Sequence, residues 1–480
     1  MVGDLPDSLL ERFSVVVGQA GLVTEAGELA PHLADWRGLY HGKAPLMIAP
    51  ASAAEAAEVI KICLAERIGV VPQGGNTGLV GGAIPHSTAA APQILLSAGR
   101  MKAIRDVDAE NYTLTAEAGC LLADVQAAAE RADRLFPLSL AAEGSCQLGG
   151  NVSTNAGGTN VLRYGNTRDL VLGLEVVLPD GRLFEGLQGL RKDNTGYDLK
   201  QLFIGAEGTL GFITAVTCKL FPRPRSVATA MVAVADPDAA IRLYGQARQA
   251  LGDQLVAFEF IGRLAMELVL THIPDTHNPL SDTPAWYVLL ELGSAGEGQD
   301  AEHRLEALLA TSMDMGLVSD GVLAQTGAHR DAFWRLRHSI SEAEKLAGAG
   351  IKHDISVPLS RVAEFLQAGE RLAVERIPGV LVVAFGHLGD GNLHFNLNQP
   401  PGMDQDAFVA LWDEISHEIH SIAVGLGGSF SAEHGIGSLK RDELERLTAD
   451  VELDLMRAVK AALDPVGIMN PGKLLPIIDR

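Results

Sequence analysis

The sequence has few cysteines, and none of them belongs to a motif. Cys63, Cys120, Cys146 and Cys218 lie far apart along the 480 residues, and no CxxC pair occurs. This spacing excludes a dense disulfide framework. We therefore expect four reduced and buried thiols, as in a cytosolic protein.

Basic residues are also scarce relative to acidic ones. The chain carries 38 Lys and Arg against 60 Asp and Glu, which gives a formal net charge of −22. Proteins that bind nucleic acid usually present a basic surface, so this balance argues against nucleic acid as a partner. An anionic substrate would have to be attracted by cations placed locally in its site.

Long apolar runs are absent as well. No stretch approaches the roughly 20 apolar residues that a membrane-spanning helix needs. The first residues include Asp4 and Asp7 and lack the basic segment that opens a signal peptide. We therefore expect a cytoplasmic protein without a membrane span.

The chain is long enough for two or three domains, and its texture changes once. Up to Pro224, predicted helices alternate with short predicted strands, and the two prolines of Phe221-Pro-Arg-Pro224 mark a boundary. Beyond it, strand and helix patterns recur as in an α+β sandwich. The helices are expected at 7–20, 54–67 and 122–133, the strands at 69–72, 93–97, 112–117 and 171–178, and the later patterns at 226–234, 237–251, 256–262, 286–293 and 301–315.

The segment from His387 to His394 predicts a hairpin that carries two histidines on one face. Asp390-Gly391 is a strong signal for a two-residue turn, which would pair His387 directly with His394. Opposed residues have Cβ atoms roughly 5 Å apart, a spacing that suits two ligands of one metal ion. Asn396, two residues further on, would project from the same face. The alternative is a hairpin whose histidines have no ligand role.

A second segment, Ser431-Ala-Glu-His-Gly-Ile-Gly437, offers a carboxylate and an imidazole between glycines. Glu433 with the two hairpin histidines would make an open site with two nitrogen ligands and one oxygen ligand, of the kind that Zn²⁺ uses in catalysis. His434 would then be available as a base.

Three glycine-rich segments, 73–78, 144–158 and 207–211, lie in the first half of the chain. They match neither the dinucleotide-binding fingerprint nor a P-loop. Glycines allow backbone N–H groups to surround an anion, although a single loop of this kind is more often a turn. Three of them suggest a long phosphorylated cofactor that lies across several loops.

Four stretches, three of them overlapping these segments, resemble the FAD-binding signature of the vanillyl-alcohol-oxidase-type flavoproteins. They are Pro72–Leu79, Gly149–Gly158, Gly205–Gly211 and the terminal Asn470–Lys473. With His387–His394 and Ala432–Gly435 added, the chain resembles the FAD-linked 2-hydroxyacid dehydrogenase branch. That branch includes D-2-hydroxyglutarate dehydrogenase, D-lactate dehydrogenase and the glycolate oxidase flavoprotein subunit.

The resemblance implies which residues hold FAD. The first loop would hold the pyrophosphate, and later segments would complete the site. The implied residues are Pro72, Gly74, Gly75, Asn76, Thr77, Gly78, Leu79, Ser145, Gly149, Asn151, Asn155, Glu207, Ile213 and Asn470. Some relatives attach the flavin covalently through a histidine in the first loop. Since this chain has Asn76 and Thr77 there, we expect non-covalent FAD.

The resemblance also implies a substrate pocket. Residues 333–341 are predicted to form a helix with Arg337 and Ser341 on one face, and Lys352 falls in a predicted strand, 350–356. Arg337, Ser341, Lys352 and Asn396 match substrate-binding positions of the D-2-hydroxyglutarate dehydrogenases. Two cations plus a metal suit a substrate with two carboxylates better than lactate, because each buried carboxylate needs a charge partner.

We therefore expect FAD- and metal-dependent oxidation of a D-2-hydroxy acid, with D-2-hydroxyglutarate as the first choice. Zn²⁺ or another divalent metal would bind the substrate, and His434 would take the hydroxyl proton while hydride moves to flavin N5. A soluble acceptor such as electron-transfer flavoprotein, and a homodimer, are expected by resemblance. The alternatives are a D-lactate dehydrogenase or glycolate oxidase subunit, a non-catalytic flavin-binding subunit, and a zinc hydrolase without flavin.

The expected fold is of the α+β class. Residues 1–224 would form an FAD-binding domain of two α+β subdomains, and residues 225–422 a substrate domain with an antiparallel sheet and flanking helices. A helical C-terminal segment, 423–480, would return to complete the active site.

Overall fold

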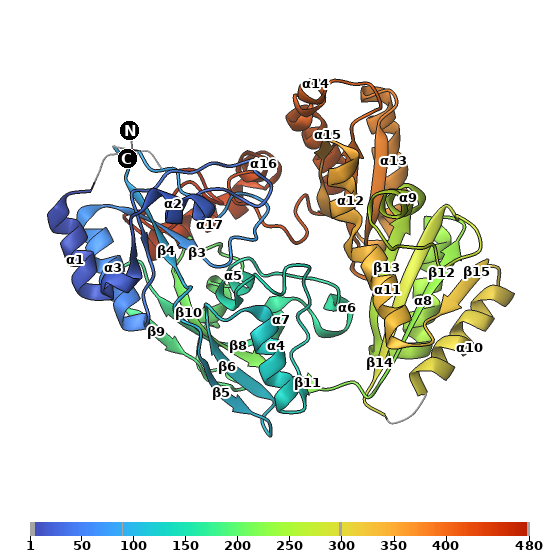
Figure 1. The fold of residues 1–480 in the computed structure, drawn as a ribbon, viewed down its shortest axis with the longest axis horizontal. Coiled ribbons are helices and arrows are strands. Elements are labelled where there is room, and N and C mark those ends of the chain that lie inside the picture. Colours follow the sequence, from blue (N-terminus) through green and yellow to red (C-terminus); the bar gives the residue numbers. More distant parts are fainter. Residues whose placement is uncertain (1–4, 89, 297–299, 478–480) are drawn as a thin grey trace. The chain divides into compact units, whose positions relative to one another are not determined.

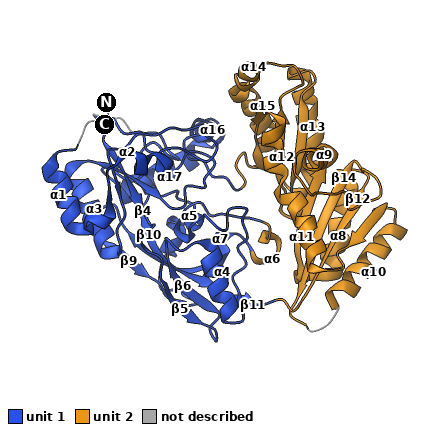
Figure 2. Ribbon diagram, in the orientation of Figure 1, with its two compact units in different colours: residues 1–158, 165–223, 433–480 blue, residues 159–164, 224–432 orange. Residues whose placement is uncertain are grey.

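The computed structural model describes residues 5–88, 90–296 and 300–477, and the chain divides into two compact units (Figure 2). The first unit takes residues 1–158, 165–223 and 433–480, and the second takes 159–164 and 224–432. Apart from the short segment 159–164, the chain passes from the first unit to the second at Pro224 and returns after Ala432. The limit expected at residue 422 falls inside helix α15 (Trp412–Gly425), so the division lies further along the chain.

The first unit begins with a small sheet whose later strands are parallel. Its order is β1-β2-β4-β3, and β2, β4 and β3 run parallel to one another. Helix α3 (Ala53–Glu66) is started by the Ser52 side chain, which accepts a hydrogen bond from the N–H of Glu55. The strands are β1 (Leu22–Val23), β2 (Met47–Ile48), β3 (Gly69–Gln73) and β4 (Gln93–Ser97), and α1 (Asp7–Val17) precedes them.

An antiparallel sheet of five strands, in the described part of the chain, completes this unit. Its order is β5-β6-β10-β8-β9. Every residue of β8 is buried, which explains why this stretch of the sequence, apart from Glu175, is apolar without alternation. The strands are β5 (Ile104–Asp108), β6 (Thr113–Glu117), β8 (Val171–Val177), β9 (Leu183–Gly186) and β10 (Phe212–Lys219); the helices include α4 (Leu122–Arg131), α5 (Leu148–Ser153), α7 (Thr167–Leu170), α16 (Arg441–Leu447) and α17 (Asp450–Leu463).

The second unit is built on one large antiparallel sheet with helices on both faces (Figure 1). Its order in the described residues is β15-β12-β14-β13-β18-β19-β16, with β17 paired to β19. The strands are β12 (Ser226–Val234), β13 (Leu255–Gly262), β14 (Trp286–Ser294), β15 (Asp320–Leu323), β16 (Gly350–Ile351), β17 (Asp354–Ser356), β18 (Leu381–His387) and β19 (Asn392–Asn398). The expected α+β class with an antiparallel second sheet is confirmed.

Two apolar cores hold the helices of this unit on the sheet. One face packs against α8 (Pro237–Leu251), α10 (Asp300–Asp314), α13 (Val362–Arg376) and α15. The opposite face packs against α9 (Arg263–His272), α11 (Gly327–His338) and α12 (Ile340–Ala347). Because successive side chains of a strand point to opposite faces, each strand contributes residues to both cores. The predicted patterns at 226–234, 237–251, 256–262, 286–293 and 301–315 correspond to β12, α8, β13, β14 and α10.

The histidine hairpin forms, but its predicted register is wrong. His387 pairs with Asn392, and His394 pairs with Phe385, because the connection is not a two-residue turn. A short 3-10 turn, Leu388–Asp390, is followed by Gly391 in the left-handed region at φ 79°. The register moves by two residues, and strand side chains repeat every two residues, so both histidines still share a face. Their ring centroids are 6.0 Å apart.

The predicted helix over residues 333–341 is also wrong. Helix α11 ends at His338, Ser339 lies in a turn, and α12 starts at Ile340. Arg337 is buried whereas Ser341 is exposed, so the two do not share the expected face. The predicted strand 350–356 is interrupted too, since Lys352 and His353 lie between β16 and β17.

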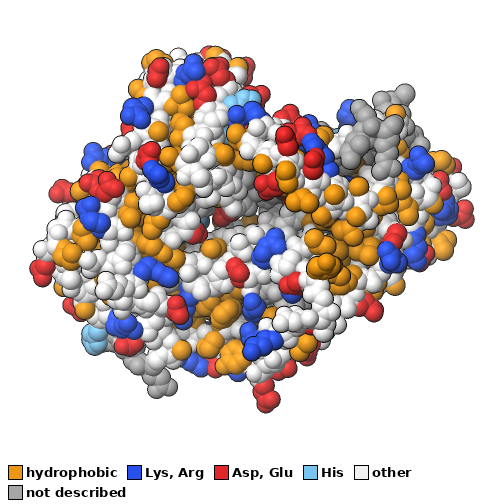
Figure 3. Space-filling model, turned by 180° about the vertical axis from the view of Figure 1, so that it is seen from behind, with side chains coloured by type: hydrophobic (Ala, Val, Ile, Leu, Met, Phe, Trp, Pro, Cys, Tyr) orange, Lys and Arg blue, Asp and Glu red, His pale blue; other side chains and the backbone are white. Residues whose placement is uncertain are grey.

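No helix in the described residues has the length and apolarity of a membrane span. On the face drawn in Figure 3, acidic and basic side chains are interspersed, without a large area of either sign.

Substitution of Gly391 tests the hairpin connection. A Cβ added at Gly391 would lie 2.2 Å from the carbonyl oxygen of Val357. Gly402 is a matched control, because its φ is 84° but an added Cβ meets nothing within 4 Å. We expect Gly402→Ala to lower the unfolding free energy by about 1–2 kcal/mol, the cost of a left-handed backbone for alanine. Gly391→Ala should lower it clearly more, because the clash with Val357 is added. Urea unfolding measures both, and equal losses would contradict the described turn.

Candidate active site

The first glycine-rich loop presents a row of backbone N–H groups without acceptors. Strand β3 ends at Gln73, and none of the N–H groups of residues 74–78 donates to another group among the described residues. Consecutive N–H groups of this kind form a concave site for an anion. The loop therefore has the chemistry that the pyrophosphate of FAD requires.

The second glycine-rich segment packs directly on the first. A Cβ at Gly75 would lie 2.0 Å from the carbonyl oxygen of Ser145, so only glycine allows this approach. Part of the segment is helix α5, and Gly149 donates its N–H to the carbonyl of Ala118 at 2.8 Å. The buried Asn151 Oδ1 and Gln147 Oε1 have no hydrogen-bond partner among the described residues.

Glu207 and Asn470 join the third glycine-rich segment to the C-terminal part of the chain. The Glu207 carboxylate accepts from the N–H groups of Ile436 at 2.7 Å and Gly437 at 2.8 Å. The Asn470 amide donates to the carbonyls of Glu207 at 2.7 Å and Gly82 at 3.0 Å. Burial raises the pKa of Glu207, against the effect of those N–H donors and of nearby lysines. Both residues therefore tie the loops together.

Some of the other residues implied to bind FAD also make hydrogen bonds within the protein. The Asn76 side chain donates to the carbonyl of Ala34 at 2.8 Å, and Asn155 accepts from the N–H of Arg168 at 2.8 Å. Both have left-handed backbones, at φ 54° and 49°. Ile213 is buried in β10, and Ser145 is exposed. Pro72, Thr77 and Leu79 are half-buried in the first loop or beside it.

The region has space and unused hydrogen-bonding capacity for a cofactor. A Cβ added at Gly78, Gly144 or Gly150 would meet no atom within 4 Å. Asn470 Oδ1 is a third buried acceptor without a partner among the described residues. Open backbone, unused donors and unused acceptors together fit a large ligand with phosphates and ring N–H groups.

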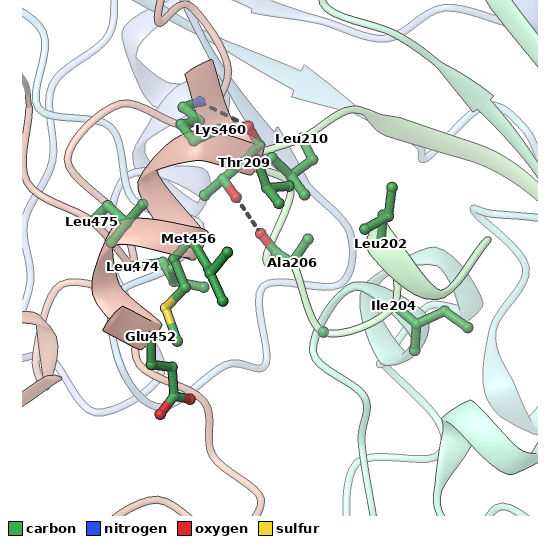
Figure 4. Close-up of a pocket in the computed structure, with 13 residues that line it drawn as sticks. Leu202, Ile204, Ala206, Thr209, Leu210, Glu452, Met456, Lys460, Leu474 and Leu475 are labelled. Carbon is green, nitrogen blue, oxygen red and sulfur yellow. Dashed lines mark hydrogen bonds between the residues drawn. The ribbon is translucent and has the colours of Figure 1, made fainter. Parts of the chain in front are cut away.

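A separate groove of the first unit has a different character. Its volume is about 410 Å³, and Figure 4 shows its lining by α17 and residues 202–210. Lys460 donates to the carbonyl of Thr209 at 2.7 Å on one side of it. The lining is mainly apolar and includes none of the predicted site residues, so the predicted cofactor residues lie elsewhere.

In the second unit, polar side chains interrupt one otherwise apolar face of the sheet. Glu259 on β13 lies opposite His387 on β18, and Asp354 on β17 lies opposite His394 on β19. Asn396 follows on the same face of β19. Side chains from four adjacent strands are thus collected at one place.

Glu259 connects a predicted metal ligand to a predicted substrate-binding residue. Its Oε1 lies 2.7 Å from Nδ1 of His387, and its Oε2 accepts from Nε of Arg337 at 2.8 Å. Burial would raise the pKa of Glu259, but His387 and Arg337 outweigh it and hold the pKa below its usual value. The terminal nitrogens of Arg337 have no hydrogen-bond partner among the described residues, so they can bind an anion.

Glu344 plays a similar part beside the other predicted cation. Its Oε2 accepts from Lys352 at 3.1 Å and from the Asn396 amide at 3.0 Å. Its Oε1 is buried without a partner among the described residues. Burial raises the pKa of Glu344, and Lys352 opposes this shift.

Sequence reasoning missed three acidic residues of this site: Glu259, Glu344 and Asp354. A carboxylate oxygen of Asp354 lies within 4.8 Å of a ring nitrogen of His394, and it accepts from the Asn392 amide at 2.9 Å. Glu259 stands alone among apolar residues in Leu255–Gly262, a pattern that signals a functional strand residue. Glu344 gave no such signal, because a glutamate on a helix is normally solvated.

Glu433 and His434 begin the last segment of the first unit. Nε2 of His434 lies 3.9 Å from Oε1 of Glu433. Ala432, the preceding residue, belongs to the second unit and donates its N–H to the carbonyl of Asp354 at 3.3 Å. The chain therefore leaves the polar site of the second unit immediately before Glu433.

Substitution of Gly78 tests the anion-binding loop. We expect Gly78→Ala to leave the stability of the flavin-free protein unchanged, because its Cβ meets nothing, and to weaken FAD binding about tenfold, which is about 1.4 kcal/mol. Gly75→Ala is the control that should lower stability through the clash with Ser145. FAD titration and urea unfolding measure the two effects. Wild-type FAD affinity in Gly78→Ala would contradict the assigned loop.

Lys473 gives a pH-dependent test of the C-terminal segment. Its ammonium donates to Ser438 Oγ at 2.8 Å, and burial, with help from Arg441, lowers its pKa from 10.5 to about 8. Between these values the unfolded chain binds more protons than the folded one, so stability gains with rising pH. We expect the unfolding free energy of wild type relative to Lys473→Met to increase from about pH 8 to about pH 10 in urea titrations. A flat or falling difference would contradict a buried amine.

Comparisons with known proteins identify two family matches in this chain. Residues 44–186 match the family described as FAD binding domain, and residues 223–474 match FAD linked oxidases, C-terminal domain. A probable D-2-hydroxyglutarate dehydrogenase of Oryza sativa subsp. indica is 40% identical over 97% of this chain and 81% of its own length. The Bos taurus D-2-hydroxyglutarate dehydrogenase is 41% identical over 98% of this chain and 84% of its own.

A Saccharomyces cerevisiae protein named D-2-hydroxyglutarate–pyruvate transhydrogenase is 37% identical over 93% of this chain and 90% of its own length. Among solved structures, p-cresol methylhydroxylase has a TM-score of 0.78 at 16% identity, over 99% of this chain and 98% of that one. The latter similarity concerns the fold alone.

The expected cytoplasmic location is contradicted by these comparisons. The rice and bovine relatives are named as mitochondrial proteins, as are those of Arabidopsis thaliana and Danio rerio. The expectation depended on a missing basic segment near the first residue, and such an absence does not specify a compartment.

The identity to the dehydrogenases, at 40% and 41%, extends over nearly the whole chain. One family model covers the first two glycine-rich segments, and the other covers the second sheet together with residues 433–474. The chain therefore belongs to the FAD-linked oxidase family, in the branch of the FAD-linked 2-hydroxyacid dehydrogenases that contains the D-2-hydroxyglutarate dehydrogenases.

Proposed function

We propose that this protein oxidises D-2-hydroxyglutarate to 2-oxoglutarate with non-covalent FAD as the hydride acceptor. The observation that carries the proposal is the pair of cations on one face of the second unit. Arg337 and Lys352 are each held by a buried carboxylate, and they lie on the same sheet face as His387 and His394. Two fixed cations suit a substrate with a carboxylate at each end.

The first unit would hold FAD through the loop at 74–78 and the unused acceptors of Asn151 and Asn470. FAD supplies the acceptor for the hydride that leaves C2 of the substrate. The remaining FAD contacts, at Pro72, Leu79, Ser145, Gly149, Asn155, Glu207 and Ile213, stay part of this proposal. Backbone donors keep the pyrophosphate in place without a counter-ion.

A divalent metal ion such as Zn²⁺ would be held by His387, His394 and Glu433. Glu259 accepts the Nδ1 proton of His387, so Nε2 carries the lone pair that a metal needs. A bound metal supplies a Lewis acid that lowers the pKa of the substrate hydroxyl. The side chains themselves fit this ion, because they are two imidazoles and a carboxylate.

Charge balance gives a second reason for the metal. Two cations, Arg337 and Lys352, stand against four carboxylates of the proposed site, Glu259, Glu344, Asp354 and Glu433, so the balance without a metal is −2. A net negative charge repels a substrate with two negative charges. A divalent ion would bring the balance to zero and remove that repulsion.

His434 is proposed as the base that takes the hydroxyl proton. An imidazole does this near neutral pH, and the Glu433 carboxylate, whose Oε1 lies 3.9 Å from Nε2 of His434, would stabilise the imidazolium once the proton has been taken. Arg337 and Lys352 would fix which face of C2 meets the flavin. Asn396 and Ser341 remain proposed substrate contacts, although Ser341 is exposed and Asn396 already bonds Glu344 and the N–H of His353.

D-lactate and glycolate are the alternative substrates. Each has a single carboxylate, so only one of Arg337 and Lys352 would bind a substrate carboxylate when either is bound. The reduced flavin would pass its electrons to a soluble acceptor such as electron-transfer flavoprotein. The yeast relative's name suggests a 2-oxo acid as another acceptor. A homodimer is part of the proposal by resemblance.

Anaerobic flavin reduction tests the proposal. We expect D-2-hydroxyglutarate to bleach the flavin absorbance faster than D-lactate or glycolate, and a chelator to slow this reaction. Faster bleaching by D-lactate would contradict the assignment of a pocket for two carboxylates. A bleaching rate that the chelator does not change would contradict the proposed metal ion. A purified protein without flavin absorbance would overturn the cofactor assignment.

His434→Ala tests the base. It should slow bleaching by D-2-hydroxyglutarate about 10²–10⁴-fold while FAD content stays at the wild-type level. His329→Ala, at an exposed histidine of α11, is the matched control and should react as wild type. Full-rate bleaching by His434→Ala would exclude it as the base.

A further inference from the structure

We infer that Glu259 is a positioning residue that couples metal binding at His387 to substrate binding at Arg337. The inference deepens the proposed function and rests on it. Glu259 lies in the middle of β13, a strand whose other residues are apolar or glycine, and only 1% of it is exposed. It touches neither substrate nor cofactor in this role, because it acts through two other side chains.

Both carboxylate oxygens of Glu259 are committed, each to a different element. Oε1 lies 2.7 Å from Nδ1 of His387 on β18, and Oε2 accepts from Nε of Arg337 on α11 at 2.8 Å. A buried carboxylate is stable only with such partners. Because Glu259 is almost fully buried, water cannot take the place of His387 or Arg337. The carboxylate therefore fixes the separation between the histidine ring and the guanidinium.

The bond to His387 determines which ring nitrogen can act as a ligand. A carboxylate can only accept, so Nδ1 must carry the proton and Nε2 the lone pair. Carboxylates in this position orient metal-binding histidines and raise their basicity, and their loss typically costs about 10–100-fold in metal affinity or activity.

The bond to Arg337 leaves the outer edge of the guanidinium for substrate. Nε is used by Glu259, while the two terminal nitrogens have no partner among the described residues and the group stacks 5.0 Å from the centre of the Phe385 ring. An arginine held at Nε presents its terminal pair as a fork for a carboxylate. Loss of Glu259 should therefore reduce substrate affinity and metal affinity together.

The competing explanation is an ordinary ion pair that only fastens α11 to the sheet. The chain contains a matched example of one. Glu291 lies on the neighbouring strand β14, faces the same way, and accepts from Arg330 at 2.7 and 2.8 Å and from Trp334 at 2.8 Å. Arg330 and Trp334 belong to α11 as Arg337 does, but they are not predicted site residues.

The test compares Glu259→Gln with Glu291→Gln in the flavin-containing protein. Glutamine keeps the shape, but its single carbonyl oxygen cannot accept from both partners. We expect Glu259→Gln to bind Zn²⁺ about 10–100-fold more weakly in a chelator competition and to raise KM for D-2-hydroxyglutarate by a similar factor. Glu291→Gln should change both by less than about twofold, although its thermal unfolding temperature falls.

Equal effects of the two substitutions on metal affinity and KM would overturn the inference, as would a Glu259→Gln protein with wild-type values. If Glu259→Gln does not fold, Glu259→Asp is measured instead, since it keeps the charge but is too short to reach both partners. The thermal unfolding temperature of each variant reports folding of the second unit, where both substitutions lie.

Failure of the proposed function would appear in the wild-type protein and is thereby distinguishable. If D-2-hydroxyglutarate did not reduce the wild-type flavin, the Zn²⁺ competition would still decide whether Glu259 supports His387. If wild type bound no metal, the change in KM would still decide whether Glu259 supports Arg337.

Discussion

The carboxylate of Glu259 must be matched from outside its own strand, because β13 offers only apolar neighbours. A histidine from one side and an arginine from another supply the match, at a place where a single unpaired charge would cost several kcal/mol. Glu344 repeats the arrangement with Lys352 and Asn396. Burial of acidic groups therefore brings the groups that we propose to bind substrate and metal together on one face of the sheet. Without this pairing the face would be an ordinary apolar core.

The first unit solves a different problem, since its site consists of hydrogen-bonding capacity that the protein leaves unused. The N–H groups of 74–78 and the oxygens of Asn151 and Asn470 find no partners among the described residues. Such groups cost free energy in a folded protein, and a ligand that satisfies them stabilises the folded state. Close backbone packing, as between Gly75 and Ser145, holds the loops together before the ligand binds.

The accuracy of the sequence-based predictions followed the range of the forces involved. Strand and helix patterns such as 226–234 and 237–251 were located well, because periodic burial is a local property. The turn at Asp390-Gly391 and the helix across Ser339 were wrong, because neighbouring elements determine the connection and the break there. The shared face of His387 and His394 was still predicted, since an error of two residues leaves strand alternation unchanged. The break between α11 and α12 places Arg337 and Ser341 on different faces, because a helix that is interrupted does not keep the i, i+4 spacing.

The sequence by itself determined the α+β class, the glycine-rich loops, the histidine pair and the resemblance to FAD-linked dehydrogenases, because each is contained in a short stretch of residues. Only the tertiary structure decided which charges stand together. Glu259 is 128 residues from His387 and 78 from Arg337 along the chain, and no local pattern connects them. Their association follows from strand order and from the burial of a carboxylate among apolar residues, and both exist only once the sheet has formed.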